Sequence, residues 1–127
     1  MSEENVELAL RASELFKRKD LHGFLALMAR DVRFQPQLGP SSAGHDGIRR
    51  VWNLLQTPDY IIEVVEVRDL GADLVLAVVR ERGGSVGSAA SFQQTVWIPS
   101  RWRQGECIWW GVFLTEQDAL GALGLRG

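Results

Sequence analysis

The chain has 127 residues, of which 46% are hydrophobic and 24% charged, and its formal net charge at pH 7 is −2. These values are typical of a globular domain with a substantial core, and they exclude the strongly basic composition with which proteins neutralise nucleic-acid phosphates. We therefore expect one domain over residues 1–127 and no nucleic-acid partner.

Cysteine content and apolar runs bear on where the protein is found. The single cysteine, Cys107, has no second cysteine with which to form an internal disulfide. No run of about 18 apolar residues predicts a membrane span, and the acidic, polar start of the chain lacks the apolar core of a signal peptide. We expect a cytoplasmic protein without a membrane partner.

Three amphipathic helices are predicted in the first half of the chain. Apolar residues recur at helical spacing over residues 2–19, and Asp20 is suited to cap a second helix with Phe24 on its buried face. Asp46 is expected to cap a third helix, which should end shortly before Pro58. A short last helix, capped by Thr115, is predicted near the end of the chain.

Period-two alternation predicts the strands. They are expected over residues 31–35, 61–67, 74–82, 90–102 and 106–114, with a turn over 69–73 and a hairpin loop over 83–88. Pro99 cannot donate to a ladder and is expected to mark a bulge or bend. The stretch 106–114 is apolar on nearly every residue, so we expect it to lie centrally in the sheet. Helices followed by consecutive antiparallel strands predict an α+β fold.

Segments over the whole chain resemble SnoaL-like proteins of the nuclear transport factor 2-like superfamily. They are MSEENVE (1–7), RASELF (11–16), DL (20–21), DVRFQP (31–36), GHDGIR (44–49) and ALGALGL (119–125). The resemblance implies a cone, in which three N-terminal helices pack in a strongly curved antiparallel sheet, followed by a short C-terminal helix. It also implies a pocket at the open end of the cone.

A homodimer is expected through the convex face of the sheet. Members of the superfamily commonly pair in this way. The stretches 74–79 and 107–114 are apolar on both faces, so one face of each can pack on helices while the other meets a second chain.

Isomerase chemistry is disfavoured at the positions that the resemblance indicates. Ketosteroid isomerases of the superfamily use an aspartate base just before the proline that ends the first strand, where this chain has Gln35 before Pro36. Their oxyanion tyrosine would fall near Ala12 and Ser13, and neither residue can replace it. An enolising step needs both a base and an oxygen-binding donor.

Two residues are candidate catalytic groups. Arg80 could serve an epoxide-hydrolase-type site, but it could also mark the point where its strand emerges into solvent. His45 could act as a general base at the pocket mouth, but a solvated loop histidine is the favoured interpretation. The spacing of His, Cys, Asp and Glu does not suit a metal site, so we expect no metal and no cofactor.

Aromatic residues indicate a ligand pocket. We expect Trp52, Phe34, Trp110 and Phe16 to line a cavity for a flat apolar or aromatic molecule, with Ser13, Gln35 and Gln94 as its polar contacts. The alternative is that the five tryptophans form core and dimer surface. The sequence leaves open which tryptophans face the pocket, and also the strand register between Trp97 and Trp102.

Three functions are compatible with these features. The favoured one is a binding protein for a small apolar or aromatic molecule. The second is an enzyme of the polyketide cyclase, isomerase or epoxide hydrolase type, and the third is a structural dimer with a vestigial pocket.

Overall fold

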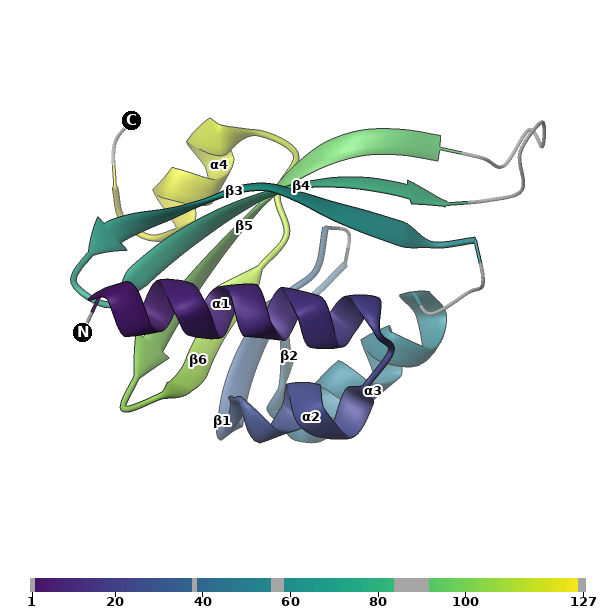
Figure 1. Cartoon of the computed structure of the whole chain (residues 1–127), viewed down its shortest axis with the longest axis horizontal. Helices are drawn as coiled ribbons and strands as arrows, with labels where there is room; N and C mark the ends of the chain where they lie inside the picture. The colour runs from purple at the N-terminus through teal and green to yellow at the C-terminus, as the bar shows by residue number, and fades with distance from the viewer. Residues whose placement is uncertain (1, 38, 56–58, 84–91, 126–127) are drawn as a thin grey trace.

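In a computed structural model that describes residues 2–37, 39–55, 59–83 and 92–125, a curved sheet of six strands lies between helices on its two faces (Figure 1). The helices are α1 (Ser2–Lys17), α2 (Leu21–Ala26), α3 (Gly44–Leu55) and α4 (Glu116–Ala122). The strands are β1 (Met28–Gln35), β2 (Ser42–Ala43), β3 (Ile61–Gly71), β4 (Leu74–Gly83), β5 (Phe92–Arg103) and β6 (Glu106–Gly111). No helix within the described ranges is long and apolar enough to cross a membrane.

The sheet is mixed rather than wholly antiparallel. Its strand order is β2-β1-β6-β5-β4-β3, so the apolar strand β6 lies inside the sheet, between β1 and β5. The strands from β3 to β6 pair antiparallel in succession. The expectation of an antiparallel sheet is wrong for β1, which pairs with β6 in parallel and places Phe34 beside Trp110. The long crossover between β1 and β6, which includes α3 and the strands β3 to β5, permits parallel pairing.

Pro99 affects the end of β6 rather than the pairing of β4 with β5, which stay in register past this residue. The N–H of Trp97 donates to the carbonyl of Phe113 at 2.8 Å, on the side of β5 that faces β6. Backbone N–H groups two residues apart in a strand point to the same side, so the N–H of residue 99 would also point to β6. Pro99 has no N–H, and β5 therefore lacks a donor to β6 at this position. β6 accordingly ends at Gly111 instead of Leu114, and Phe113 rejoins the sheet as a single bridge.

The expected caps of α2 and α4 are present. The side chains of Asp20 and Thr115 each accept a hydrogen bond from the backbone N–H three positions later, at 2.9 and 3.0 Å. The expected cap of α3 is wrong, because this helix begins at Gly44 and Asp46 lies in its first turn, 2.8 Å from Arg49. Acidic residues favour the first turn as well as the cap position, since the helix dipole is positive there.

The turn between β3 and β4 is shorter than the predicted span of 69–73. It consists of Ala72 and Asp73, whose φ angles of 51° and 64° are those that a two-residue hairpin turn requires. Most of the loop expected over 83–88, the first two residues of the strand expected over 90–102 and the proline expected after the third helix lie outside the described residues.

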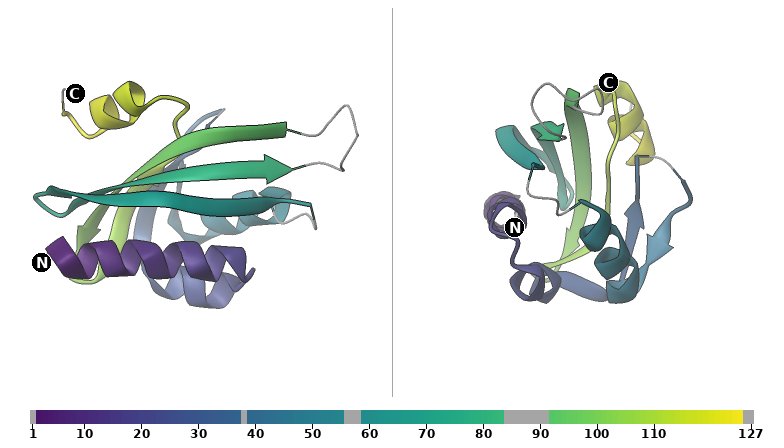
Figure 2. Two further views of the ribbon diagram at one scale, coloured as in Figure 1. Left: turned by 45° about the horizontal axis from the view of Figure 1, so that its top comes forward. Right: turned by 90° about the vertical axis from the view of Figure 1, so that its right-hand side faces the viewer.

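The concave face of the sheet packs against α1 (Figure 2). In β4, Val75, Ala77 and Val79 point to this face, and each is at most 6% exposed. Val32 of β1 and Cys107 of β6 are buried in the same layer. Burial of one such aliphatic side chain contributes roughly 1.5–3 kcal/mol, so this layer holds α1 against the strands.

The convex face of the sheet is partly covered by α4 of the same chain (Figures 1 and 2). Ala119 of α4 is fully buried, and Glu116 accepts a hydrogen bond from Arg68 of β3. The apolar outward-pointing residues of β4 are Leu74, Leu76 and Val78, and all three are buried in the single chain. The apolar outer face of β4 therefore needs no second chain to cover it.

Aromatic side chains on β6 and just after it leave another part of the convex face partly open. Trp109 points away from the concave face, since its neighbour Trp110 faces inward, and its ring lies 6.5 Å from that of Phe113. Both residues are half-buried, and Leu114 is 49% exposed. A homodimer through the sheet stays a prediction, and this aromatic part of the convex face is where it would form.

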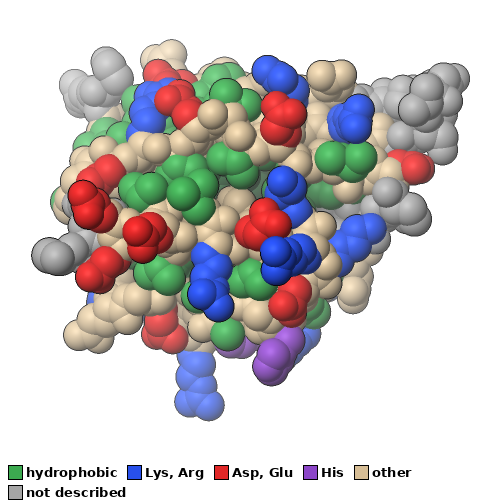
Figure 3. Space-filling view, viewed as in Figure 1, with side chains coloured by type: hydrophobic (Ala, Val, Ile, Leu, Met, Phe, Trp, Pro, Cys, Tyr) green, Lys and Arg blue, Asp and Glu red, His purple; other side chains and the backbone are tan. Residues whose placement is uncertain are grey.

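Charges of both signs are interspersed on the face seen in Figure 3. On that face no broad basic surface forms of the kind that binds nucleic-acid phosphates. This distribution agrees with the net charge of −2.

Candidate functional site

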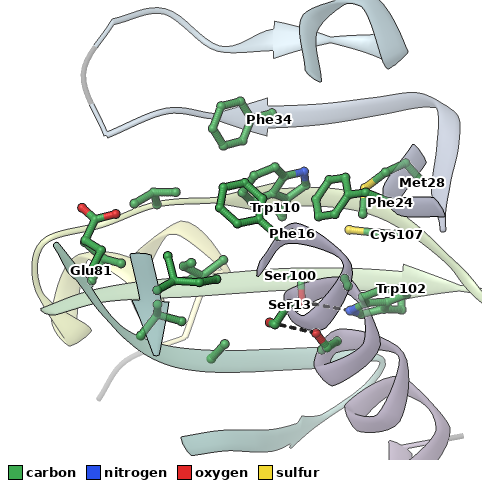
Figure 4. Close-up of a pocket in the computed structure, with 18 of the residues that line it drawn as sticks. Ser13, Phe16, Phe24, Met28, Phe34, Glu81, Ser100, Trp102, Cys107 and Trp110 are labelled. Atoms are coloured by element: carbon green, nitrogen blue, oxygen red, sulfur yellow. Dashed lines mark hydrogen bonds between the residues drawn. The ribbon is translucent and has the colours of Figure 1, made fainter. Parts of the chain in front are cut away.

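A cavity of about 100 Å³ lies between α1 and the concave face of the sheet (Figure 4). This volume is several times what one buried water requires, so the cavity has room for a small organic molecule. The helices α1 and α2, the strand β1 and every strand from β3 to β6 contribute to its wall. Nearly all of the lining side chains are apolar.

Three small residues on α1, namely Ala9, Ala12 and Ser13, leave the space. Ala9, Ala12, Ser13 and Phe16 follow one stripe of the helix at spacings of three and four, and all four line the cavity. Ala77 faces them from β4. With short side chains on both sides, the helix and the strands do not fill the volume between them.

One wall of the cavity is aromatic. Phe34 and Trp110 are neighbours across the parallel pair β1–β6, and their ring centroids are 4.1 Å apart. The ring of Phe24 lies 5.9 Å from that of Trp110 and 6.1 Å from that of Phe16. Such ring contacts contribute about 0.5–1.5 kcal/mol each beyond area burial, so the wall is formed before any ligand arrives.

Most polar atoms of the lining already have partners within the protein. The hydroxyl of Ser13 donates to the carbonyl of Ala9 at 3.1 Å, and the indole N–H of Trp102 donates to the hydroxyl of Ser100 at 2.8 Å. The indole nitrogen of Trp110 differs, because it is buried and has no hydrogen-bond partner among the described residues. A ligand acceptor is one kind of group that would satisfy it.

Cys107 belongs to the apolar part of the lining. Burial raises the pKa of its thiol to about 12. The group therefore stays protonated at neutral pH, and it acts as a small hydrophobic side chain rather than as a nucleophile.

Glu81 is the acidic residue of the lining. It lies near the end of β4, it is 7% exposed, and its carboxylate stands at one end of the cavity (Figure 4). The hydroxyl of Tyr60 donates to Oε2 at 2.5 Å, and the side-chain amide of Gln94 donates to Oε1 at 2.6 Å. Each carboxylate oxygen thus accepts one hydrogen bond from a neutral side chain.

Tyr60 completes this polar end. Burial is the largest cause that raises the pKa of its hydroxyl above the ordinary value, followed by the hydrogen bond to Glu81 and the charge of that residue. The hydroxyl therefore remains a donor to Glu81 over the whole physiological range. The Tyr60 ring also packs edge-on against Phe16, with centroids 6.0 Å apart, and this contact links the polar end to the aromatic wall.

The structure brings four of the seven predicted ligand-contact residues to the cavity surface, namely Ser13, Phe16, Phe34 and Trp110. Trp52 lies outside the lining. Its ring centroid is 5.0 Å from that of Phe16 and 5.2 Å from that of Phe24. Trp52 thus supports two rings of the aromatic wall from behind.

The two predicted glutamine contacts also lie outside the lining. Gln35 uses its amide within its own segment, where Nε2 donates to the carbonyl of Pro36 at 3.1 Å. Gln94 contacts Glu81 instead of the cavity, and its side-chain amide donates a hydrogen bond to Oε1 of Glu81.

The candidate catalytic residues His45 and Arg80 are not part of the cavity wall. Nε2 of His45 lies 3.1 Å from the carbonyl oxygen of Met28, so this ring joins the start of α3 to the start of β1. Arg80 is exposed, with its guanidinium 3.5 Å from the carboxylate of Glu63 on the neighbouring strand. Their positions provide no contact with a cavity ligand.

The structure shows to which face of the sheet the strand tryptophans point and how β5 pairs with its neighbours. β4 and β5 are in register from Trp97 to Arg101, and the shift between β5 and β6 lies between Arg101 and Trp102. Trp102 and Trp110 face the cavity. Trp97 and Trp109 occupy alternate positions and therefore face the convex side.

Glu81 is the feature that sequence reasoning missed. It lies between Arg80 and Arg82, next to the position where the sequence predicts that the strand can emerge into solvent. The alternation of side chains along the strand could have revealed it. Glu81 comes two residues after Val79 and four after Ala77, so all three side chains point to the inward face. Tyr60 was missed because it precedes its strand, where its side-chain direction depends on the tertiary fold.

Comparison with known proteins places the chain in a family context. Residues 9–107 of the chain match the model of a protein family whose description is "SnoaL-like domain". A search of curated proteins finds no match.

Solved structures share the fold over nearly the whole chain. A nuclear transport factor 2-like protein of unknown function from Burkholderia pseudomallei has 22% identity and a TM-score of 0.77, with 95% of this chain and 97% of that chain covered. TerC, co-crystallised with polyporic acid, has 18% identity and a TM-score of 0.74, with 96% and 97% covered. A proposed polyketide cyclase from Xanthomonas campestris pv. campestris has 16% identity and a TM-score of 0.71, with 94% and 96% covered. Identities this low establish the cone-shaped fold alone.

Proposed function

The chain belongs to the SnoaL-like domain family, and we propose that it binds a small, mainly apolar or aromatic molecule in the cavity between α1 and the sheet. The observation that carries this proposal is the lining itself, which combines a preformed aromatic wall with few polar groups. Transfer of an apolar ligand into such a cavity is favourable because it removes apolar surface from water.

The structural neighbours support a ligand of this general kind. TerC was crystallised with a small organic molecule, polyporic acid, and another neighbour is described as a proposed polyketide cyclase. We take from them the expectation of a small-molecule ligand, and the identity of the ligand must come from the lining of this chain.

Binding is favoured over enolising catalysis. The positions that resemble the isomerase base and oxyanion donor hold Gln35, Ala12 and Ser13, and none of these supplies the required group. The hydroxyl of Ser13 is moreover engaged with the carbonyl of Ala9.

An enzyme of the cyclase or isomerase type is the second candidate, and one observation favours it. Glu81 is a carboxylate within a mainly apolar lining, which is a common setting for a general base. We rank this candidate below binding because both oxygens of Glu81 already accept hydrogen bonds from the protein. A structural dimer with a vestigial pocket ranks third, since the cavity is not filled by the chain's own side chains.

A thermal-shift screen with neutral steroids and aromatic polyketides tests the proposal. A ligand at 100 times its Kd stabilises the folded state by about 2.7 kcal/mol, which raises Tm by roughly 8 °C or more for a chain of this size. We expect at least one compound to produce a saturable shift of this order.

An Ala77→Phe variant should remove the shift, because the added ring occupies the cavity from β4. Ala26→Phe is the matched control, since Ala26 lies exposed at the end of α2. The Tm of each ligand-free variant reports whether it folds. Binding that survives Ala77→Phe would refute the proposal. So would a screen, extended from neutral compounds to aromatic amines and acids, without a single saturable shift.

A further inference from the structure

Glu81 is a buried carboxylate without a cationic partner in the described part of the protein. Its hydrogen-bond partners are Tyr60 and Gln94, and both are neutral donors. No ion pair links it to a lysine, arginine or histidine among the described residues. A carboxylate accepts about four hydrogen bonds, so part of the accepting capacity of Glu81 is unused.

The neighbouring arginines do not supply the missing charge by direct contact. Arg80 and Arg82 flank Glu81 in β4, and a strand points adjacent side chains to opposite faces. The guanidinium of Arg80 lies 3.5 Å from Glu63, and both side chains are at least 50% exposed. Arg82 is also exposed.

A buried anion of this kind favours a ligand that brings a positive charge. Taking a carboxylate out of water is costly unless it is paired, and a cation bound beside it removes much of that cost. The rings of Tyr60 and Phe16 border the same end of the cavity, and aromatic faces attract cations as well.

We propose that the ligand of this cavity is a cationic amphiphile, whose protonated amine pairs with Glu81 and whose aromatic or aliphatic body lies along the apolar wall. This inference rests on the proposed function and assigns the chemical class of its ligand. Figure 4 shows the geometry that supports it, with Glu81 at one end of the cavity, Phe34 and Trp110 further in, and Trp102 at the far end.

Three probes with the same naphthalene body and different charges test the proposal. They are 2-naphthylmethylamine, 2-naphthylmethanol and 2-naphthoic acid, and titration calorimetry measures their Kd values. We expect the amine to bind about 10- to 100-fold more tightly than the alcohol, as is typical of a charge-assisted hydrogen bond. The naphthoate should bind most weakly, because its charge repels that of Glu81.

Glu81→Gln is the decisive variant. The glutamine keeps the shape of the side chain, and its oxygen can accept from Gln94 while its amide donates to the Tyr60 oxygen. We expect the amine-to-alcohol preference to fall to about one and the Kd of the alcohol to change little. Glu63→Gln, which neutralises an exposed carboxylate on the convex face, should keep the full preference.

Each outcome bears on one proposal or on both. Equal binding of the amine and the alcohol by the wild type, tighter binding of the naphthoate, or an amine preference that survives Glu81→Gln would overturn the cationic ligand and leave the proposed function intact. If Glu81→Gln does not fold, Tyr60→Phe supplies the second test. This variant keeps the carboxylate of Glu81 and frees one of its acceptor sites. The preference for the amine over the alcohol should therefore be maintained or increase. Failure of all three probes to bind, together with a negative neutral screen, would refute the proposed function itself.

Discussion

Alkaline conditions should destabilise the protein through Cys107. Burial raises the pKa of this thiol from 9.0 to about 12 in the folded state. Below pH 9 the folded and unfolded chains both hold the proton, so the stability is complete. Between pH 9 and pH 12 the unfolded chain releases the proton while the folded chain retains it, and the free energy of unfolding therefore falls as the pH rises.

The size of this effect follows from the two pKa values. At pH 10 about nine tenths of the unfolded thiols and almost none of the folded thiols are ionised, which lowers the free energy of unfolding by an amount on the order of 1 kcal/mol relative to pH 7. Tyr60 acts in the same direction above pH 10, since the pKa of its hydroxyl is also raised.

Urea unfolding at pH 7 and pH 10, followed by tryptophan fluorescence, measures the loss. Cys107→Ala is the control, because it removes the thiol and leaves every other titrating group in place. We expect the wild type to lose more stability than the variant over this pH interval, by an amount on the order of 1 kcal/mol. Equal losses in the two proteins, or rapid reaction of the native thiol with a disulfide reagent at pH 8, would refute the reasoning.

Three further changes test the fold and the assembly. Trp109→Glu places a charge on the open aromatic part of the convex face. The mass measured by light scattering should fall from twice the 14.2 kDa chain mass to that of a single chain. A wild type that is already monomeric at micromolar concentration would contradict the predicted dimer. Thr115→Ala removes the cap of α4 and should cost about 1 kcal/mol in urea unfolding, whereas Thr115→Ser should cost little. Phe34→Ala removes a buried ring of the aromatic wall and should cost about 3–5 kcal/mol. Leu10 of α1, which is 44% exposed, should tolerate alanine with a change below about 0.5 kcal/mol.

Local signals predicted much of the fold. The helical stripe of α1, the caps Asp20 and Thr115 and the period-two strands depend on neighbouring residues, so a single sequence carries them. The parallel pairing of β1 with β6 could not be predicted in this way, because it depends on how two strands distant in sequence meet in the folded chain. The end of β6 similarly depends on the missing N–H of Pro99, which lies on another strand.

The cavity lining contains four of the residues that the sequence predicts for it, and it also contains Glu81 and Tyr60, which the sequence does not predict. Phe16, Phe34 and Trp110 are apolar residues on faces whose direction follows from the local period. Glu81 has the period of an inward residue, but the extent to which a strand end is covered depends on the helix and the Tyr60 segment packed against it. A charged residue near a strand end is therefore ambiguous until the tertiary structure is known.

The most direct test of the central claim is a crystal structure of the chain grown with 2-naphthylmethanol, the neutral probe. The account predicts ligand density between α1 and the sheet, with the naphthalene against Phe34 and Trp110. A cavity filled by the chain's own side chains, or density only on the protein surface, would contradict it.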